Sequence, residues 1–184
     1  MMKRCILCAL CILMCVTHCA YFAAPAEQIT LPSLFTDDMI LQREIKVPVW
    51  GKATPAGKVT VEFQDQKKAT VADENGAWMI RLDPMPAGGP FTLKIIGKET
   101  IQLSNVMVGE IWVCSGQSNM EWGVNNSNNA REEIAAADHP NIRLFHVNQA
   151  TSLNEQEDVD AGAWKVCSSS SIPSFSAVAY FFGR

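Results

Sequence analysis

Short runs of alternating apolar and polar residues occupy the chain from residue 28 to residue 107. Val59, Val61 and Phe63 stand at every second position, with polar residues between them. Since successive side chains of a strand point to opposite faces, this period predicts antiparallel strands with one buried face. Further strands are predicted over residues 47–51, 78–82 and 91–95. Short strands at this spacing predict an antiparallel β-sandwich domain over residues 27–107.

Turn-forming residues separate these strands. They are concentrated in residues 54–57 and 84–90, and in the dipeptide Asn75-Gly76. Asn and Gly both tolerate positive φ, so this dipeptide predicts a two-residue type I′ hairpin.

The hydrophobic pattern changes near residue 106. Residues 106–114 form a denser apolar run, which predicts a central strand with Cys114 as a buried thiol at its end. A helix is predicted over residues 130–138, stopped by Pro140, and a second strand over residues 142–147. A last helix, capped by Ser174 or Ser176, is expected to run through Phe182. This order predicts the first part of an α/β domain over residues 108–184.

The N-terminus has the features of a signal peptide. Lys3 and Arg4 precede an apolar run over residues 5–16, which is shorter than the roughly 20 residues of a transmembrane helix. Small residues at 24–26 predict cleavage after Ala26, and hence a secreted or periplasmic protein without stable membrane insertion. A retained anchor is the alternative. Lipid attachment at Cys19 is disfavoured because His18 is too large for the position before a lipidated cysteine.

Composition and charge narrow the range of partners. The chain is 48% hydrophobic and 18% charged, with a formal net charge of −4, which indicates a folded protein without affinity for nucleic acid. Beyond the predicted leader only Cys114 and Cys167 remain, so no disulfide framework is expected, although a bridge between these two stays open. No metal-ligand cluster or Gly-rich phosphate loop is visible, and neither a metal nor a cofactor is expected.

Ser118 is the candidate for chemistry. A serine in a Gly-containing turn, after a buried strand and before a helix, would expose its hydroxyl at the carboxyl edge of a sheet. Backbone N–H groups at such a turn can stabilise an oxyanion. On spacing alone, an ordinary loop explains the same residues.

The exact residues of this segment are more informative than their spacing. Residues 108–122, which include Ser-Gly-Gln-Ser-Asn-Met at 115–120, closely resemble the first conserved block of the sialate O-acetylesterase family. That family belongs to the SGNH-type hydrolases, which have a flavodoxin-like α/β fold. The likeness extends to residues 34–42, 75–78 and 175–184.

The resemblance implies a function for the residues of this turn. Ser118 would be the nucleophile, with its own N–H in the oxyanion hole, and Gly116, Gln117 and Asn119 would shape the turn. The implied reaction removes O-acetyl groups from sialic acid or related acetylated sugars through an acetyl-serine.

Two neighbouring residues are candidates for the substrate pocket. Glu121 lies close to Ser118 in sequence, and Trp122 could stack on a sugar ring, although core packing is the alternative for this indole. A glycosidase pair formed from Glu110, Glu121, Glu132 and Glu133 is a further alternative. A solvated helix face explains Glu132 and Glu133 as well.

A base for Ser118 is not evident. The resemblance implies an Asp-x-x-His pair, yet neither His139 nor His146 stands in that context. We therefore expect a fragment that lacks the catalytic His and Asp, is inactive alone and exposes apolar surface in residues 108–184. The alternatives are a non-catalytic carbohydrate-binding module built on the β-sandwich, and a non-functional gene fragment.

Overall fold

The computed structural model describes residues 28–184. The predicted signal peptide at 1–26, the alternative of a retained anchor and the question of lipid attachment at Cys19 lie outside the described residues. Within residues 28–184, no helix has the length and apolar character needed to cross a membrane.

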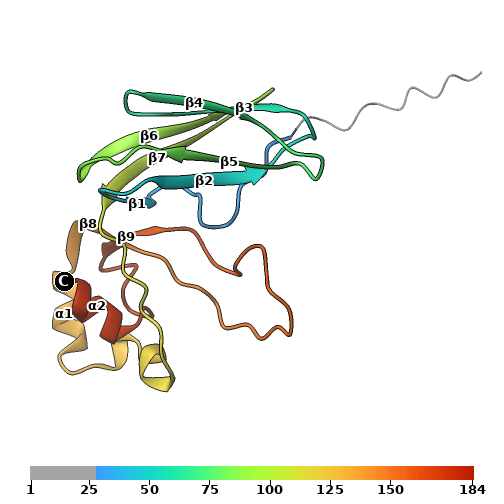
Figure 1. Ribbon diagram of the computed structural model, residues 1–184. Helices are drawn as coiled ribbons and strands as arrows, with labels where there is room; N and C mark the ends of the chain where they lie inside the picture. Colours follow the sequence, from blue (N-terminus) through green and yellow to red (C-terminus); the bar gives the residue numbers. More distant parts are fainter. Residues whose placement is uncertain (1–27) are drawn as a thin grey trace, which may run out of the picture.

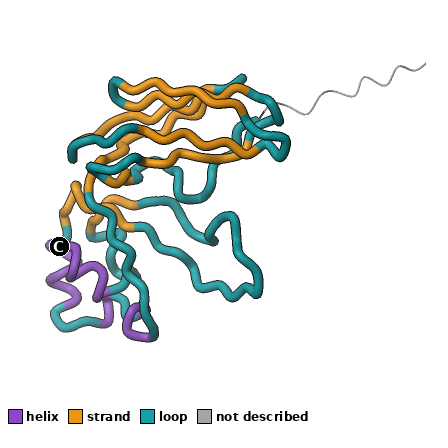
Figure 2. The backbone as a smooth tube through the Cα atoms, viewed as in Figure 1, coloured by secondary structure: helices purple, strands orange, loops and turns teal. Residues whose placement is uncertain are grey.

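Most of the regular secondary structure in the described chain is β-strand (Figures 1 and 2). The largest sheet has five strands in the order β1, β7, β6, β3, β4; their bounds are Ile40–Gln42, Thr100–Gly109, Gly88–Ile96, Lys58–Phe63 and Gln66–Val71. A two-stranded antiparallel sheet joins β2 (Val47–Lys52) to β5 (Ala77–Leu82).

The five-stranded sheet is mixed, not purely antiparallel as predicted. β1 pairs parallel with β7, with Ile40 opposite Met107 and Gln42 opposite Gly109. A hairpin cannot make a parallel pair, but the whole chain between these two strands serves as the connection. The last strand of this region is thereby held beside the first.

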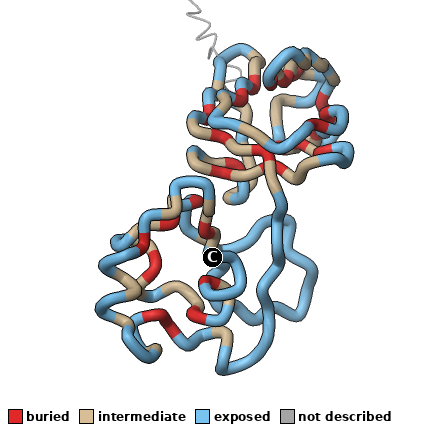
Figure 3. Tube along the Cα trace, turned by 90° about the vertical axis from the view of Figure 1, so that its left-hand side faces the viewer, coloured by how far each residue is buried: buried red, intermediate tan, exposed pale blue. Residues whose placement is uncertain are grey.

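The core of this region lies between the two sheets. Val59, Val61 and Phe63 of β3 are at most 1% exposed, and they belong to one cluster with residues of both sheets. The alternating residues thus have one buried face, as predicted. Figure 3 shows the buried positions recurring along these strands.

The prediction of a two-residue type I′ hairpin at Asn75-Gly76 is wrong. The turn does not connect paired strands, because β4 pairs with β3 and β5 pairs with β2. Gly76 alone of the two has a positive φ, of 77°, whereas a type I′ turn needs both. The Asp73 carboxylate organises the turn by accepting the N–H groups of Asn75 and Ala77, at 2.9 and 2.8 Å. The chain passes here from one sheet to the other.

The rest of the described chain forms a smaller unit of two strands, two short helices and two 3₁₀ turns. β8 (Asp138–Leu144) pairs antiparallel with β9 (Lys165–Ser168), beside α1 (Ala130–Ala136), α2 (Ala177–Gly183) and the 3₁₀ turns η1 (Ser118–Glu121) and η2 (Val124–Asn126). The final helix begins as predicted, since the Ser176 hydroxyl accepts the N–H of Ala179 at 3.3 Å. The predicted helix over 130–138 is shorter than expected, because Ala137 leaves helical geometry and β8 begins at Asp138. The predicted boundary between the two domains, after residue 107, falls inside β7. The division into these two domains stays a prediction.

The strand predicted over residues 106–114 ends at Gly109. Beyond it, Trp112 is 67% and Val113 is 90% exposed. No described strand pairs with residues 110–117, so their apolar side chains have no sheet neighbour. Cys114 is exposed, which corrects its prediction as a buried thiol, whereas Cys167 is buried; the two are not bridged. The expected exposed apolar surface is present here.

A long loop between β8 and β9 returns to the first sheets. Trp164 donates its indole N–H to the carbonyl of Leu34 at 2.9 Å and its backbone N–H to the Thr36 hydroxyl at 3.2 Å. The Asp158 carboxylate accepts the N–H and the hydroxyl of Ser33. These contacts hold the loop against the segment before β1.

Candidate active site at Ser118

Ser118 begins η1, at the end of the extended segment that leaves β7 (Figure 1). The carbonyl of Gln117 accepts the N–H of Met120 at 2.8 Å, and the carbonyl of Asn119 accepts the N–H of Trp122 at 3.4 Å. A Cβ atom at Gly116 would lie 2.7 Å from Cγ of Met120, so any other residue at this position would displace the Met120 side chain. These contacts are local, and they explain the compact turn around Ser118.

The hydroxyl and the backbone N–H of Ser118 have no hydrogen-bond partner among the described residues. Ser118 is exposed, and its Oγ makes no hydrogen bond to any described residue. The first N–H groups of a helical turn have no partner within the turn, so those of Ser118 and Asn119 are free to bind an anion. The arrangement suits a nucleophile beside a pair of oxyanion donors.

The chain after Ser118 is fixed to α2. The carbonyl of Trp122 accepts the N–H of Ala177 at 2.7 Å, and the N–H of Val124 binds the carbonyl of Phe175 at 3.1 Å. An isolated bridge joins Gly123 to Ser176. This downstream anchor sets where η1 ends.

The candidate pocket residues Glu121 and Trp122 are both exposed. Trp122 is 56% exposed, so core packing does not account for this indole in the described structure. The indole N–H of Trp122 donates to the carbonyl of Asn126 at 3.0 Å. This bond restrains the ring of a residue that is close to Ser118 in the sequence. The roles of these two residues in binding substrate stay predictions.

The chain before Ser118 is fixed to β1. Gln42, the last residue of β1, contacts both Glu110 and Ile111. Sequence reasoning missed this contact, although Gln42 ends the segment 34–42 that resembles the family. The pairing joins positions 69 apart, and no local pattern predicts it.

No described residue supplies Ser118 with a base. His139 lies in β8 with its ring 6.3 Å from that of Tyr180, and His146 is exposed; neither side chain hydrogen-bonds to Ser118. Within residues 28–184, no group of His, Cys, Asp or Glu is arranged to hold a metal ion.

The carboxylates of the alternative glycosidase pair have other partners or none. Glu110 pairs with Arg43 at 3.2 Å, and Glu133 accepts the Tyr180 hydroxyl at 2.7 Å. Glu132 is exposed on α1, as expected of a solvated helix face. An open pocket of about 390 Å³ in the described part of the chain is lined by Asp38, Trp164, Lys165 and nearby serines, and by no residue of the Ser118 turn.

Comparison with known proteins identifies relatives along most of the chain. No family model matches the sequence. The human sialate O-acetylesterase is 32% identical over 174 residues, covering 83% of this chain and 33% of the relative. The mouse protein of the same name is 35% identical over 134 residues, covering 66% of this chain and 25% of the relative.

A solved structure agrees in fold. The crystal structure of a carbohydrate acetylesterase from Xanthomonas citri superposes with a TM-score of 0.82 at 35% identity, covering 84% of this chain and 36% of that one. Fold and sequence therefore place the chain among the relatives of carbohydrate-directed ester hydrolases. The chain belongs to the sialate O-acetylesterase family, and it spans about a third of the length of the relatives it matches. The family resemblance predicted from the sequence is confirmed.

Proposed function

We propose that this chain supplies the nucleophile of a serine O-acetylesterase acting on sialic acid or related acetylated sugars. The observation that carries the proposal is the exposed Ser118 at the start of η1, in a chain homologous to sialate O-acetylesterases. In this proposal, the chain consists of a β-sandwich followed by the first part of an SGNH-type α/β domain. The proposal includes export to the periplasm or the medium.

In the proposed reaction, Oγ of Ser118 attacks the carbonyl carbon of the acetyl group. The N–H of Ser118 donates to the oxyanion that develops, and Gln117 and Asn119 hold the turn in place. The base takes the Ser118 proton and passes it to the sugar oxygen, so that the sugar leaves as an alcohol. Water then hydrolyses the acetyl-serine, which releases acetate and restores the serine. Glu121 and Trp122 would contact the sugar beside the reacting carbon.

A serine hydroxyl needs a general base to become an effective nucleophile. His139 and His146 make no contact with Ser118, so we propose that the base comes from outside residues 28–184 and that this stretch is inactive by itself.

The non-catalytic carbohydrate-binding alternative has less support. Sugar-binding sites usually offer exposed aromatic faces, but the aromatic rings of residues 28–109 are packed inward. Trp50 packs edge-on against Phe35 at 4.8 Å, and Phe91 against Phe63 at 5.6 Å. Trp78 is 4% exposed. The described sheets thus lack an exposed aromatic platform for a sugar.

The test is a chimera in which this chain is continued by the remaining part of the Xanthomonas citri relative. We expect the chimera to release acetate from acetylated sugars and Ser118→Ala to lower kcat by about 10³-fold or more. Ser115→Ala, in the same turn, is the matched control and is expected to retain activity. Persistence of activity in Ser118→Ala would contradict the proposal.

The 184-residue chain is assayed in parallel with an activated acetyl ester. We expect no turnover above that of Ser118→Ala. Turnover that this substitution abolishes would show that the chain contains its own base, and would overturn the proposed inactivity while supporting Ser118 as the nucleophile.

A further inference from the structure

We infer that Gln42 is a positioning residue for the Ser118 turn, holding the chain where it leaves the five-stranded sheet. The inference rests on the proposed role of Ser118 and adds to it a residue from the opposite end of the sheet region.

The side-chain amide of Gln42 contacts two consecutive residues after β7. Its Oε1 accepts the backbone N–H of Ile111 at 2.9 Å, and its Nε2 donates to Oε2 of Glu110 at 2.9 Å. One planar group therefore fixes both the backbone and the neighbouring side chain. The direction in which the chain leaves Gly109 is set by these two bonds.

Arg43 supports the same junction. Its backbone N–H donates to the carbonyl of Gly109 at 2.9 Å, which continues the parallel pairing of β1 with β7. Its guanidinium Nε lies 3.2 Å from Oε1 of Glu110. The two oxygens of Glu110 thus face different groups: Oε2 accepts the hydrogen bond from Gln42, and Oε1 lies at ion-pair distance from Arg43, whose Nε makes no hydrogen bond to a described residue.

Little else holds the segment between Ile111 and Ser118. Residues 112–116 make no hydrogen bond to any other described residue, and the ring of Trp112 packs edge-on against the exposed ring of Phe182, with centroids 5.1 Å apart. The next fixed point is the carbonyl of Trp122 on Ala177. The Ser118 turn is therefore a loop suspended between an upstream anchor at Gln42 and a downstream anchor at α2.

Release of the upstream anchor would let this loop sample more conformations, since fixing both ends of a loop restricts its interior. A displacement of the nucleophile by about 1 Å can lower a rate by 10²-fold. The contact at Gln42 is therefore expected to affect the rate of acetyl transfer more than the binding of sugar.

The chain offers a matched control in Gln66. This glutamine, at the start of β4, also binds a backbone segment with both ends of its amide: Nε2 donates to the carbonyl of Asp83 at 3.3 Å, and Oε1 accepts the N–H of the same residue at 2.7 Å. Gln66→Ala removes the same type of contact from a junction that does not lead to Ser118.

The first test uses amide NMR of the 184-residue chain. In Gln42→Ala we expect the resonances of Ile111, Gly116, Ser118 and Asn119 to shift, and amide exchange at Ile111 to rise by about tenfold or more. Gln66→Ala is expected to leave all four unchanged. Unchanged Ser118 and Asn119 resonances in Gln42→Ala would overturn the inference, whatever the role of Ser118.

A compensating pair separates positioning from general loss of stability. Gln42→Glu places a carboxylate against Glu110 and is expected to shift the same resonances. Adding Glu110→Gln restores a donor opposite the new carboxylate, so the double variant should return toward the wild-type spectrum. Failure of this rescue in a folded double variant would contradict the proposed geometry.

The second test uses the chimera described above. Gln42→Ala should lower kcat by roughly tenfold or more with KM nearly unchanged, whereas Gln66→Ala should alter neither. A fall in kcat equal for both variants would show a global effect and overturn the inference. Loss of activity on Ser118→Ala is scored separately, so the two proposals can fail independently.

Discussion

Tyr180 shows how one buried hydroxyl joins the two helices of the smaller unit. The side chain is 2% exposed, and its OH donates to Oε1 of Glu133 at 2.7 Å, while Arg184 pairs with the same oxygen. Burial, followed by the hydrogen bond to Glu133, raises the pKa of Tyr180 to about 12 from an ordinary value of 10.0. The neutral phenol is therefore the form that the folded state favours.

This pKa predicts a loss of stability in alkaline solution. Because the folded pKa lies above the unfolded one, the stabilisation is complete below pH 10 and is lost as the pH rises through about 12. Tyr180→Phe should reduce this pH dependence and cost about 1 kcal/mol at neutral pH. Urea unfolding at several pH values measures both effects.

A spectroscopic titration checks the same value directly. The chain has two tyrosines, Tyr21 and Tyr180, so protein expressed without residues 1–26 retains one phenol. Its phenolate absorbance near 295 nm should develop around pH 12. A midpoint near pH 10 in folded protein would contradict the burial of this hydroxyl.

At the residue scale, local chemistry was predictable and distant contacts were not. The cap at Ser176 and the turn at Gly116 follow from side chains within a few positions. The exposure of Cys114 and the contact of Gln42 with Ile111 depend on which strands lie nearby, and that information is absent from the local pattern. The catalytic role of Ser118 stays a prediction that rests on the resemblance.

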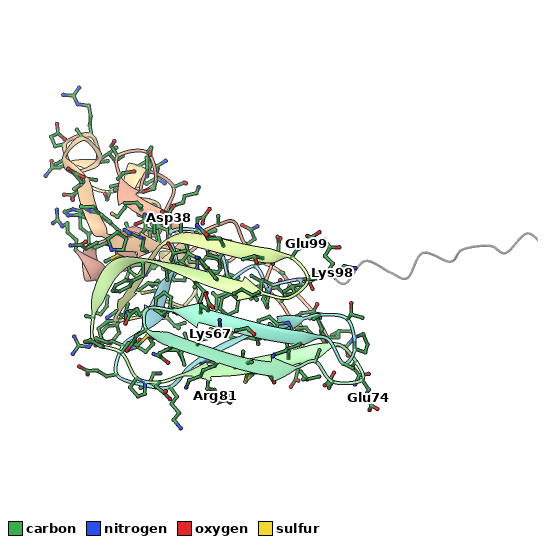
Figure 4. The ribbon with its side chains drawn as sticks, turned by 90° about the horizontal axis from the view of Figure 1, so that it is seen from above. Asp38, Lys67, Glu74, Arg81, Lys98 and Glu99 are labelled. Atoms are coloured by element: carbon green, nitrogen blue, oxygen red, sulfur yellow. The ribbon has the colours of Figure 1, made fainter. Side chains whose placement is uncertain are left out.

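At the element scale, β3 lies between β4 and β6 and sets the charge pattern of the outer face. Glu62 stands opposite Lys67 on one side and Lys94 on the other, and Lys67 Nζ lies 2.7 Å from Oε1 of Glu62. Lys67 projects from β4 in the view from above (Figure 4). The hydrogen bond from Lys67 holds the pKa of Glu62 below its ordinary value.

Glu62 lies between Lys67 and Lys94, and reversing its charge should destabilise the sheet. Glu62→Lys places three like charges side by side across neighbouring strands, so the melting temperature is expected to fall. The fall should diminish at 1 M salt, where the Debye length is about 3 Å. Thr60→Lys, one row along between Ala69 and Ile96, is the control and should show a weaker salt response. Equal responses in the two variants would contradict the register.

The strands that the sequence predicted differ in their surroundings from the strands that it did not predict. β3 and β5 were predicted because an alternating apolar face meets a core, whereas β4 escaped because its residues alternate only between half-buried and exposed at the sheet edge. β1 is three residues long and β9 is four, too short for a reliable period of two. The strand predicted to residue 114 failed because apolar residues form a strand only where a partner strand is present.

At the scale of the whole molecule, the described chain has two hydrophobic clusters of unequal size. The one between the sheets has 19 buried residues, and the one beside β8 and α2 has seven. Each α-helix has seven residues, a length at which isolated helices are marginal. Most of the packing energy therefore lies in the sheet region.

The unequal size of the two hydrophobic clusters predicts a difference in the rate of amide hydrogen exchange. Backbone amides of β3 and β6 should exchange at the slowest rates in the chain, and those of α1, α2, β8 and β9 at markedly faster rates. Mass spectrometry of peptides after deuterium labelling measures both groups. Equal protection in the two would show that the contacts of Trp164 with Leu34 and Thr36 make one cooperative unit.

The parallel pairing of β1 with β7 has a consequence for synthesis on the ribosome. Gln42 emerges from the exit tunnel long before its partner Ile111, and the parallel pair of β1 with β7 cannot form until the chain between them has been made. Any nascent chain whose sheet has failed to close would therefore leave Ser118 on an untethered loop. Substitutions in the cluster between the sheets would then lower the fraction of newly made protein in which the Ser118 turn is anchored to β1.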